Sequence, residues 1–381
     1  MVCMAKRLRI SGWARVFERS MTALARSGMK AARKSVRQTL KPVTPKKRPA
    51  TAKPRPAGAK PAKFAKLANS AEPTEQAGWT HGVAVAAAGA RRYALFRPPG
   101  ADATQQLPLL VMLHGCNQDA KGFAHSTRMN TVAAREGFMV LYPEQDRLAN
   151  PQGCWNWFDT RNGRALKEAA LILRAIDQVC LQGAADRDRV AIAGLSAGAS
   201  MAALVVTRHP DRFKAVAMHS GIAPGTAHSA LSALGAMQGR RSTKPLVHAK
   251  PLVITKPLVN AKPTTPSLKG TSWPPLLVIH GSVDRVVSAR NGQAAAQQWA
   301  TAAGARSGPA RRVQRGQRYP TTVADYKSKG RLVVTRVEIA GLGHAWSGGA
   351  SRLPYGDSRG PDASRMVWAF VNKQFLADSK G

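Results

Sequence analysis

The chain has few acidic residues. Only 20 Asp and Glu stand against 58 Lys and Arg in 381 residues, which gives a formal net charge of +38. It also lacks any run of about 18 consecutive apolar residues, so we expect no transmembrane segment. The densest apolar window, residues 83–90, is short and rich in alanine. Hydrophobic residues nevertheless make up 44% of the chain, which is enough to build a core.

Cysteine is scarce as well. The chain has four, at Cys3, Cys116, Cys154 and Cys180. This number is too small for a scaffold held together by disulfides, and the paired CxxC spacing typical of zinc sites is absent. We therefore expect no structural metal.

The basic residues are concentrated at the start of the chain. Residues 1–70 contain 19 Lys or Arg and a single acid, Glu18. Lys, Pro and Ala repeat through residues 41–66, a composition that cannot bury enough apolar surface to fold. We predict a disordered basic tail over residues 1–70, with a short amphipathic helix at about residues 10–27. The charged start has no apolar h-region after it, which favours a cytoplasmic location over secretion.

A second low-complexity segment spans about residues 240–270. It contains KPLVHA, KPLVIT, KPLVNA and KPTTPS in succession. The proline in each unit disfavours both helix and central strand, and four short units are too few for a solenoid. We predict a looped-out insertion that interrupts one folded domain covering residues 71–381.

From about residue 79 onward, short apolar runs alternate with segments of helical periodicity. The predicted strands are residues 109–113, 138–142, 190–193, 215–218, 276–279 and 333–339, and the predicted helices are residues 165–179 and 197–208. This alternation is typical of an α/β fold, with a mostly parallel sheet and helices on both faces. Chemistry is then expected at the carboxyl ends of the strands.

The sequence GLSAG at residues 194–198 lies between a predicted strand and a predicted helix. A GxSxG motif in this context places its serine on a sharp turn above the sheet, where glycines relieve crowding. A tight structural turn is the alternative explanation. We predict that Ser196 is a nucleophile.

A serine nucleophile needs a histidine base and an acid that orients the base, and in GxSxG hydrolases these follow in the order acid, then histidine. Asp284 follows the strand at residues 276–279, and His344 lies in a glycine-rich loop after residues 333–339. Asp357 and Asp362 are disfavoured because they follow the histidine. The competing histidines are His209, His219, His228, His248 and His280.

The oxyanion of an acyl-transfer intermediate needs backbone N–H donors. Ala197 directly follows the nucleophile and supplies one. The loop HGCNQ after the strand at residues 109–113 supplies the other, for which we select Cys116. Burial of the Cys116 side chain without such a role is the alternative.

Five motifs occur in order along the chain: LHGCNQ at 113–118, CWNWF at 154–158, RVAIAGLSAGASMAA at 189–203, HSG at 219–221 and GLGHAWSGG at 341–349. Together they resemble the polyhydroxybutyrate (PHB) depolymerase esterase family, which is related to feruloyl and acetylxylan esterases. The resemblance covers about residues 79–222 and 273–372. It implies an α/β-hydrolase fold and a serine esterase without a cofactor. It also implies the roles of nucleophile, acid, base and oxyanion donor for Ser196, Asp284, His344 and Cys116.

The family pattern also suggests a disulfide between Cys116 and Cys154, although in a reducing cytosol both would remain thiols. Trp155 and Trp157 are expected on the same side of an extended segment, where they form an apolar wall beside the serine or pack in the core. Trp346, next to the predicted base, has the same two interpretations.

The resemblance favours hydrolysis of poly(3-hydroxybutyrate) or its oligomers. The alternatives are a feruloyl or acetylxylan-type carbohydrate esterase and a serine peptidase of the same fold. Charge alone favours another class, a basic protein that binds nucleic acid or a granule. We predict that the tail contacts a polyanion or a polymer granule, while the α/β unit carries the chemistry.

Overall fold

The computed structural model describes residues 78–102, 104–182, 184–246 and 273–378. The predicted tail at residues 1–70, its amphipathic helix and most of the insertion at residues 240–270 lie outside the described residues. The described start of the insertion, residues 240–246, contains neither helix nor strand.

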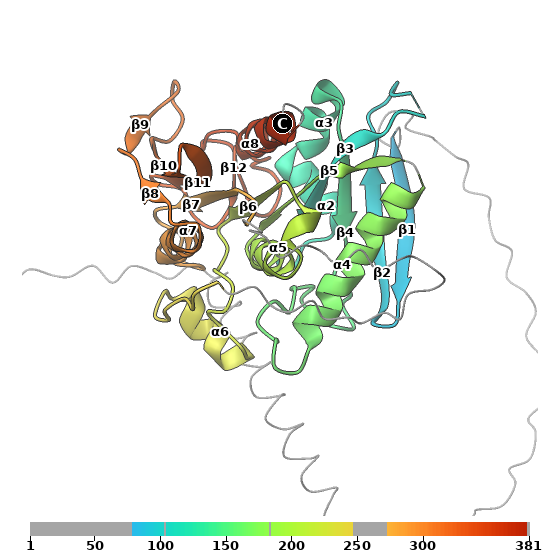
Figure 1. Cartoon of the computed structure of the whole chain (residues 1–381), viewed down its shortest axis with the longest axis horizontal. Helices are drawn as coiled ribbons and strands as arrows, with labels where there is room; N and C mark the ends of the chain where they lie inside the picture. The colour runs from blue at the N-terminus through green and yellow to red at the C-terminus, as the bar shows by residue number, and fades with distance from the viewer. Residues whose placement is uncertain (1–77, 103, 183, 247–272, 379–381) are drawn as a thin grey trace, which may run out of the picture.

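A mixed sheet of 11 strands forms the centre of the molecule (Figure 1). Its order is β1-β2-β4-β3-β5-β6-β7-β11-β10-β8, and β9 pairs with β10. The strands are β1 (Trp79–Ala86), β2 (Gly89–Phe96), β3 (Leu107–Leu113), β4 (Met139–Pro143), β5 (Ala185–Leu195), β6 (Ala215–His219), β7 (Leu276–Gly281), β8 (Arg306–Ser307), β9 (Arg311–Val313), β10 (Thr321–Ser328) and β11 (Arg331–Ile339). A separate small sheet pairs β12 (Trp346–Ser347) with β13 (Gly356–Asp357).

The middle of the large sheet, from β4 to β11, is parallel, whereas antiparallel strands extend it at both edges. The predicted strands are all present, and the prediction of a mostly parallel sheet is confirmed. The edge strands were not predicted because they lack a continuous apolar run. In β1, for example, only Ala84 is fully buried.

Helices cover both faces of the sheet (Figure 1). One face carries α4 (Arg164–Leu181), α5 (Ala197–Arg208), α6 (Ala230–Met237) and α7 (Arg290–Ala302), and the other carries α2 (Ala120–Thr127), α3 (Met129–Glu136) and α8 (Ala363–Asp378). A short 3-10 helix, η1 (Pro210–Arg212), follows α5. Within the described ranges, no helix is long and apolar enough to span a bilayer.

The alternation of side chains along β3 explains why there are two apolar cores. Leu109 and Val111 join the core on one face, and Leu110 and Met112 join the core on the other. Burial on both faces fixes the central strands, so their carboxyl ends form a stable rim. The loops that leave this rim carry the predicted functional residues.

Candidate active site

Ser196 lies at the turn between β5 and α5 and has backbone angles of φ 56° and ψ −120°. This conformation is strained for any residue that has a side chain. The flanking glycines make this turn possible. A Cβ atom on Gly194 would overlap the backbone of Gly198, and one on Gly198 would overlap the backbone of Leu113. The turn therefore requires both glycines of the GxSxG motif, and it presents the serine at the carboxyl end of the sheet.

His344 and Asp284 lie in the loops that follow β11 and β7. Nδ1 of His344 donates a hydrogen bond of 2.8 Å to Oδ2 of Asp284. The other carboxylate oxygen accepts the backbone N–H groups of Val286 and Val287, each at 2.9 Å. Because Nδ1 holds the proton in this arrangement, Nε2 is the basic nitrogen of His344.

The charge on Asp284 is stabilised by its neighbours. Burial alone would raise the pKa of this carboxyl, but His344 and the hydrogen bonds from His280 and His344 lower it well below its usual range. His280 Nε2 lies 3.5 Å from Asp284 Oδ2 and 2.9 Å from the carbonyl oxygen of Val287. Asp284 is therefore ionised and suited to stabilising an imidazolium.

A narrow pocket of about 30 Å³ brings the two sides of the rim together. Ser196 and His344 both line it, and Tyr355 contributes a wall, its ring edge-on to His344 with centroids 6.3 Å apart. The other lining residues are Gly115, Cys116, Leu195 and Val286. The structure thus gathers the three predicted residues at one rim, while their catalytic roles stay a prediction. Tyr355 lies in the loop before β13, and no sequence motif pointed to it.

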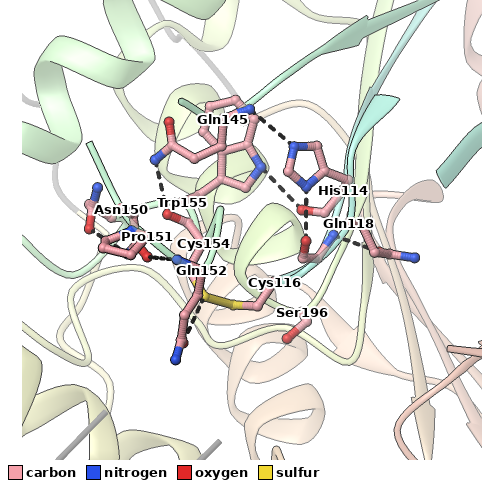
Figure 2. Close-up of a disulfide and its surroundings, with 12 residues drawn as sticks. His114, Cys116, Gln118, Gln145, Asn150, Pro151, Gln152, Cys154, Trp155 and Ser196 are labelled. Atoms are coloured by element: carbon pink, nitrogen blue, oxygen red, sulfur yellow. Dashed lines mark hydrogen bonds between the residues drawn. A yellow bond between two sulfur atoms is a disulfide. The ribbon is translucent and has the colours of Figure 1, made fainter. Parts of the chain in front are cut away.

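Cys116 forms a disulfide with Cys154 beside Ser196 (Figure 2). The sequence left this pairing open. Two hydrogen bonds fix the loop on either side of Cys116: Gly115 N donates to Gln118 Oε1 at 2.9 Å, and Asn117 N donates to the carbonyl oxygen of Gln152 at 2.7 Å. The backbone around Cys116 is therefore well anchored, as an oxyanion donor needs to be.

His114 links this loop to the segment that carries Cys154 (Figure 2). Gln145 N donates to Nε2 of His114 at 3.1 Å, and the indole N–H of Trp155 donates to the His114 carbonyl oxygen at 3.1 Å. Gln145 Nε2 in turn donates to the carbonyl oxygen of Cys154 at 2.9 Å. Burial lowers the pKa of His114, so it is a neutral structural residue.

Glu168, on α4, is a buried carboxylate that the sequence analysis missed. Its Oε1 accepts from Gln145 Nε2 at 2.7 Å and from Asn156 Nδ2 at 2.6 Å, and its Oε2 accepts from Asn156 N at 2.8 Å. Burial raises the pKa of Glu168, although these hydrogen bonds act in the opposite direction. The available signal was an acid on the apolar face of the helix predicted at residues 165–179, near Ala165 and Ile172.

A second pocket of about 20 Å³ adjoins Ser196 on the side of the disulfide. Trp155 and Trp157 both line it, in keeping with the expected apolar wall, although Trp155 is fully buried. The remaining lining residues are Cys116, Cys154, Phe158, Ala197, Ser200, Ile222, Met237 and Val287. Ala197, the other predicted oxyanion donor, therefore lies with Cys116 beside the serine.

Trp346 lies in the core and lines neither of these pockets. Its ring stacks on His219 with centroids 5.0 Å apart, and its N–H donates to Ser364 Oγ at 3.0 Å. For this residue the structure supports the packing interpretation, because the ring is enclosed between His219 and Phe123.

His219, one of the competing histidines, is also structural. Its Nε2 accepts the backbone N–H of Ser347 at 3.1 Å, and its Nδ1 lies 3.3 Å from Ser220 Oγ. Burial, together with the neighbouring His280 and His344, lowers the pKa of His219 to about 3. It is therefore neutral at physiological pH.

Comparison with known proteins adds a family assignment. A family model described as "Esterase PHB depolymerase" matches residues 91–318. The curated relatives include poly(3-hydroxyalkanoate) depolymerase C of Paucimonas lemoignei, 34% identical over 115 residues, or 30% of this chain and 28% of that protein. Feruloyl esterase B of Neurospora crassa is 26% identical over 198 residues, or 51% of this chain and 65% of that protein. The chain thus spans less than two thirds of the length of either relative.

The solved structures include the acetyl xylan esterase from Aspergillus awamori, which aligns over 70% of this chain and 94% of that one. The TM-score is 0.51 and the sequence identity 20%, so this likeness shows the fold alone. Together with the parallel sheet, the covering helices and the turn at Ser196, it identifies an α/β-hydrolase fold.

Proposed function

Because the chain belongs to the esterase PHB depolymerase family, we propose that it is a serine esterase that hydrolyses poly(3-hydroxybutyrate) or its oligomers. The observation that carries this proposal is the 2.8 Å hydrogen bond between His344 and Asp284 at a pocket that Ser196 also lines. Neither a cofactor nor a metal enters the mechanism.

In the proposed mechanism, Nε2 of His344 takes the proton of Ser196 as the serine oxygen attacks the ester carbonyl. Asp284 orients the imidazole and stabilises its charged form. The N–H groups of Cys116 and Ala197 donate to the oxyanion, which is commonly the largest stabilising contribution in acyl transfer. His344 then protonates the departing alcohol and activates the water that hydrolyses the acyl-enzyme.

The size of the two pockets at Ser196 supports a small substituent on each side of the ester. Their volumes are about 30 Å³ and 20 Å³, while one water needs roughly 10–15 Å³ on this scale. Pockets of this size favour the methyl-bearing unit of hydroxybutyrate over a feruloyl ring. An acetyl group fits as well, so an acetylxylan-type esterase is the second candidate.

The first test is the substitution Ser196→Ala. We expect hydrolysis of p-nitrophenyl acetate and butyrate to fall by roughly 10⁶-fold in kcat. Folding should be unaffected, because alanine fills the same position on the turn, and circular dichroism would check this. Turnover within tenfold of the parent enzyme would refute the assignment of the nucleophile.

The second test concerns the substrate. Rates on 3-hydroxybutyrate oligomers, acetylated xylan and methyl ferulate would be compared at equal enzyme concentration. We expect the hydroxybutyrate oligomers to be cleaved fastest and methyl ferulate slowest. A preference for acetylated xylan would favour the second candidate, and a preference for methyl ferulate would contradict the argument from pocket size.

The basic tail supports a further part of the proposal, contact with a polyanion or with a polymer granule surface. Residues 1–70 lie outside the described residues, so this part depends on charge alone. Replacing the lysines at 41, 46, 47, 53 and 60 by glutamine in the full chain should weaken co-sedimentation with granules. Unchanged co-sedimentation would show that the tail is not the contact.

A further inference from the structure

A larger concavity, apart from the two pockets at Ser196, lies between the β1–β2 hairpin, α4 and the end of α5. Its volume is about 520 Å³, against about 30 Å³ for the pocket shared by Ser196 and His344. Sites for small molecules typically have volumes of roughly 300–1,000 Å³. Arg208, which lines this groove, ends the helix that begins directly after Ser196, so about 18 Å of helix separates the two sites. The groove is therefore a separate feature of the molecule.

Alanines form most of the floor of this groove. The hairpin contributes residues 86–88, which belong to the alanine-rich run at residues 83–90. The α4 helix contributes Leu166, Ala169, Ala170 and Leu173, whose spacing of three and four residues places them on one face. Because alanine side chains are short, the hairpin and the helix enclose space between them. The floor is thus apolar and suits a hydrocarbon chain.

Arginines line the rim of the groove. Arg174, Arg208 and Arg212 line the groove together with one acid, Asp177, which pairs with Arg212 and also lies 3.6 Å from Arg187. Arg174 donates to the carbonyl oxygen of Val85 at 3.2 Å. In the described part of the chain, neither Arg174 nor Arg208 pairs with an acidic side chain. Two guanidinium groups at the edge of an apolar floor are therefore available to an anion.

We propose that this groove binds an amphipathic carboxylate, with its carbon chain over the alanine floor and its carboxylate at Arg208 and Arg174. Guanidinium groups recognise carboxylates through paired, charge-assisted hydrogen bonds. The apolar floor disfavours a small inorganic anion, and the excess of arginine disfavours a basic peptide. The ligand class is a medium-chain carboxylic acid or the free acid end of a short hydroxyalkanoate oligomer.

Binding of decanoate to the full chain would test this proposal by isothermal titration calorimetry. The parent protein carries Ser196→Ala, so that no turnover interferes. We expect Arg208→Gln to weaken decanoate binding by about tenfold, since a hydrogen bond to a charged group is lost. Decanol, which has the same chain without the charge, should bind the Arg208→Gln variant and its parent equally.

Two further variants separate the groove from other surfaces. Ala170→Leu places a larger side chain on the floor and should weaken decanoate and decanol alike, while leucine keeps the helix stable. Arg135→Gln removes an exposed arginine from α3, on the opposite face of the sheet, and should change nothing. Circular dichroism would check that each variant folds. Decanoate binding that is equal in Arg208→Gln, Ala170→Leu and their parent would overturn the proposal.

A second probe identifies the source of the carboxylate. The linear trimer of 3-hydroxybutyrate carries the same anionic end on a more polar chain. Stronger binding of the trimer than of decanoate would assign the groove to a polyester chain end, and the reverse would assign it to a fatty acid. Either result supports the proposed site if Arg208→Gln weakens binding of the probe that binds. If neither probe binds the parent protein, the proposal is overturned.

Discussion

The two sides of the candidate active site are held in place by different means. We call the loops after β3 and β5, together with residues 150–158, the nucleophile half, and the loops after β7 and β11 the base half. The nucleophile half contains the Cys116–Cys154 disulfide and the buried hydrogen bonds to Glu168. In the base half, hydrogen bonds converge on the charge of Asp284. Covalent and polar anchoring thus supports the predicted oxyanion donors, whereas electrostatics supports the predicted base.

This contrast predicts that the base half depends most on a single charge. Asp284→Asn removes that charge and keeps the side-chain shape, so the fold should persist while His344 loses its partner. We expect kcat for p-nitrophenyl acetate to fall by roughly 10⁴-fold with KM nearly unchanged. Steady-state kinetics would measure the effect.

Asp362→Asn is the matched control for this change. Asp362 accepts the backbone N–H of Arg365 at the start of α8, a position where asparagine serves as well as aspartate. Activity should remain at the parent level. A fall in kcat of less than tenfold for Asp284→Asn would show that the base half does not depend on this carboxylate.

The sequence predicted the residues at the rim because each follows a strand with a strong apolar signal. Ser196, Asp284 and His344 lie after β5, β7 and β11, and parallel strands bring their carboxyl ends to one edge. What the sequence did not predict comes from tertiary packing. Glu168 is buried only because α4 carries it under the loop at residues 154–158, and no local pattern specifies that contact.

The tryptophans show the same limit. Residues two apart in an extended segment can line one wall, as Trp155 and Trp157 do at the second pocket. No local sequence pattern distinguishes these two tryptophans from Trp346. Trp346 is buried in the core because it belongs to the small sheet of β12 and β13 and its ring stacks on His219. The edge strands were missed for a related reason, because their exposed faces weaken the apolar pattern.

The anchoring of the nucleophile half should be sensitive to loss of the disulfide. Cys154→Ser removes the disulfide between two cysteines that are 38 residues apart in the sequence. In the chain-entropy account, this loss costs about 4 kcal/mol of unfolding free energy. Because Cys116 then lies in a less constrained loop, we expect kcat to fall by about tenfold with a smaller change in KM. Urea unfolding and steady-state kinetics measure the two effects separately.

Cys180→Ala is the control, since this buried cysteine near the end of α4 forms no disulfide and lines neither pocket at Ser196. It should leave kcat unchanged. If the parent enzyme treated with a thiol reductant kept full activity, the disulfide would not be what positions the oxyanion donors.

His219 connects the two halves. It ends β6, which lies between β5 and β7, and its Nε2 accepts the backbone N–H of Ser347, three residues after His344. This contact requires the neutral imidazole, because a protonated Nε2 has no lone pair to offer. Acid should therefore weaken the junction between the halves.

The direction of the pH effect follows from the pKa of His219, about 3 in the folded protein against about 6.5 in the unfolded chain. Between these values only the unfolded chain binds the proton, so this residue's contribution to stability is complete above about pH 6.5 and is lost as the pH falls. The expected loss is about 1.4 kcal/mol per pH unit.

His219→Gln tests this effect, because glutamine keeps an acceptor for the Ser347 N–H but does not titrate. Urea titration would measure the unfolding free energy of this variant between pH 6 and pH 4. We expect it to fall less steeply with decreasing pH than that of the parent protein, by about 1.4 kcal/mol per pH unit, which corresponds to one proton. Equal slopes in the two proteins would show that His219 is not the group through which acid acts on the junction.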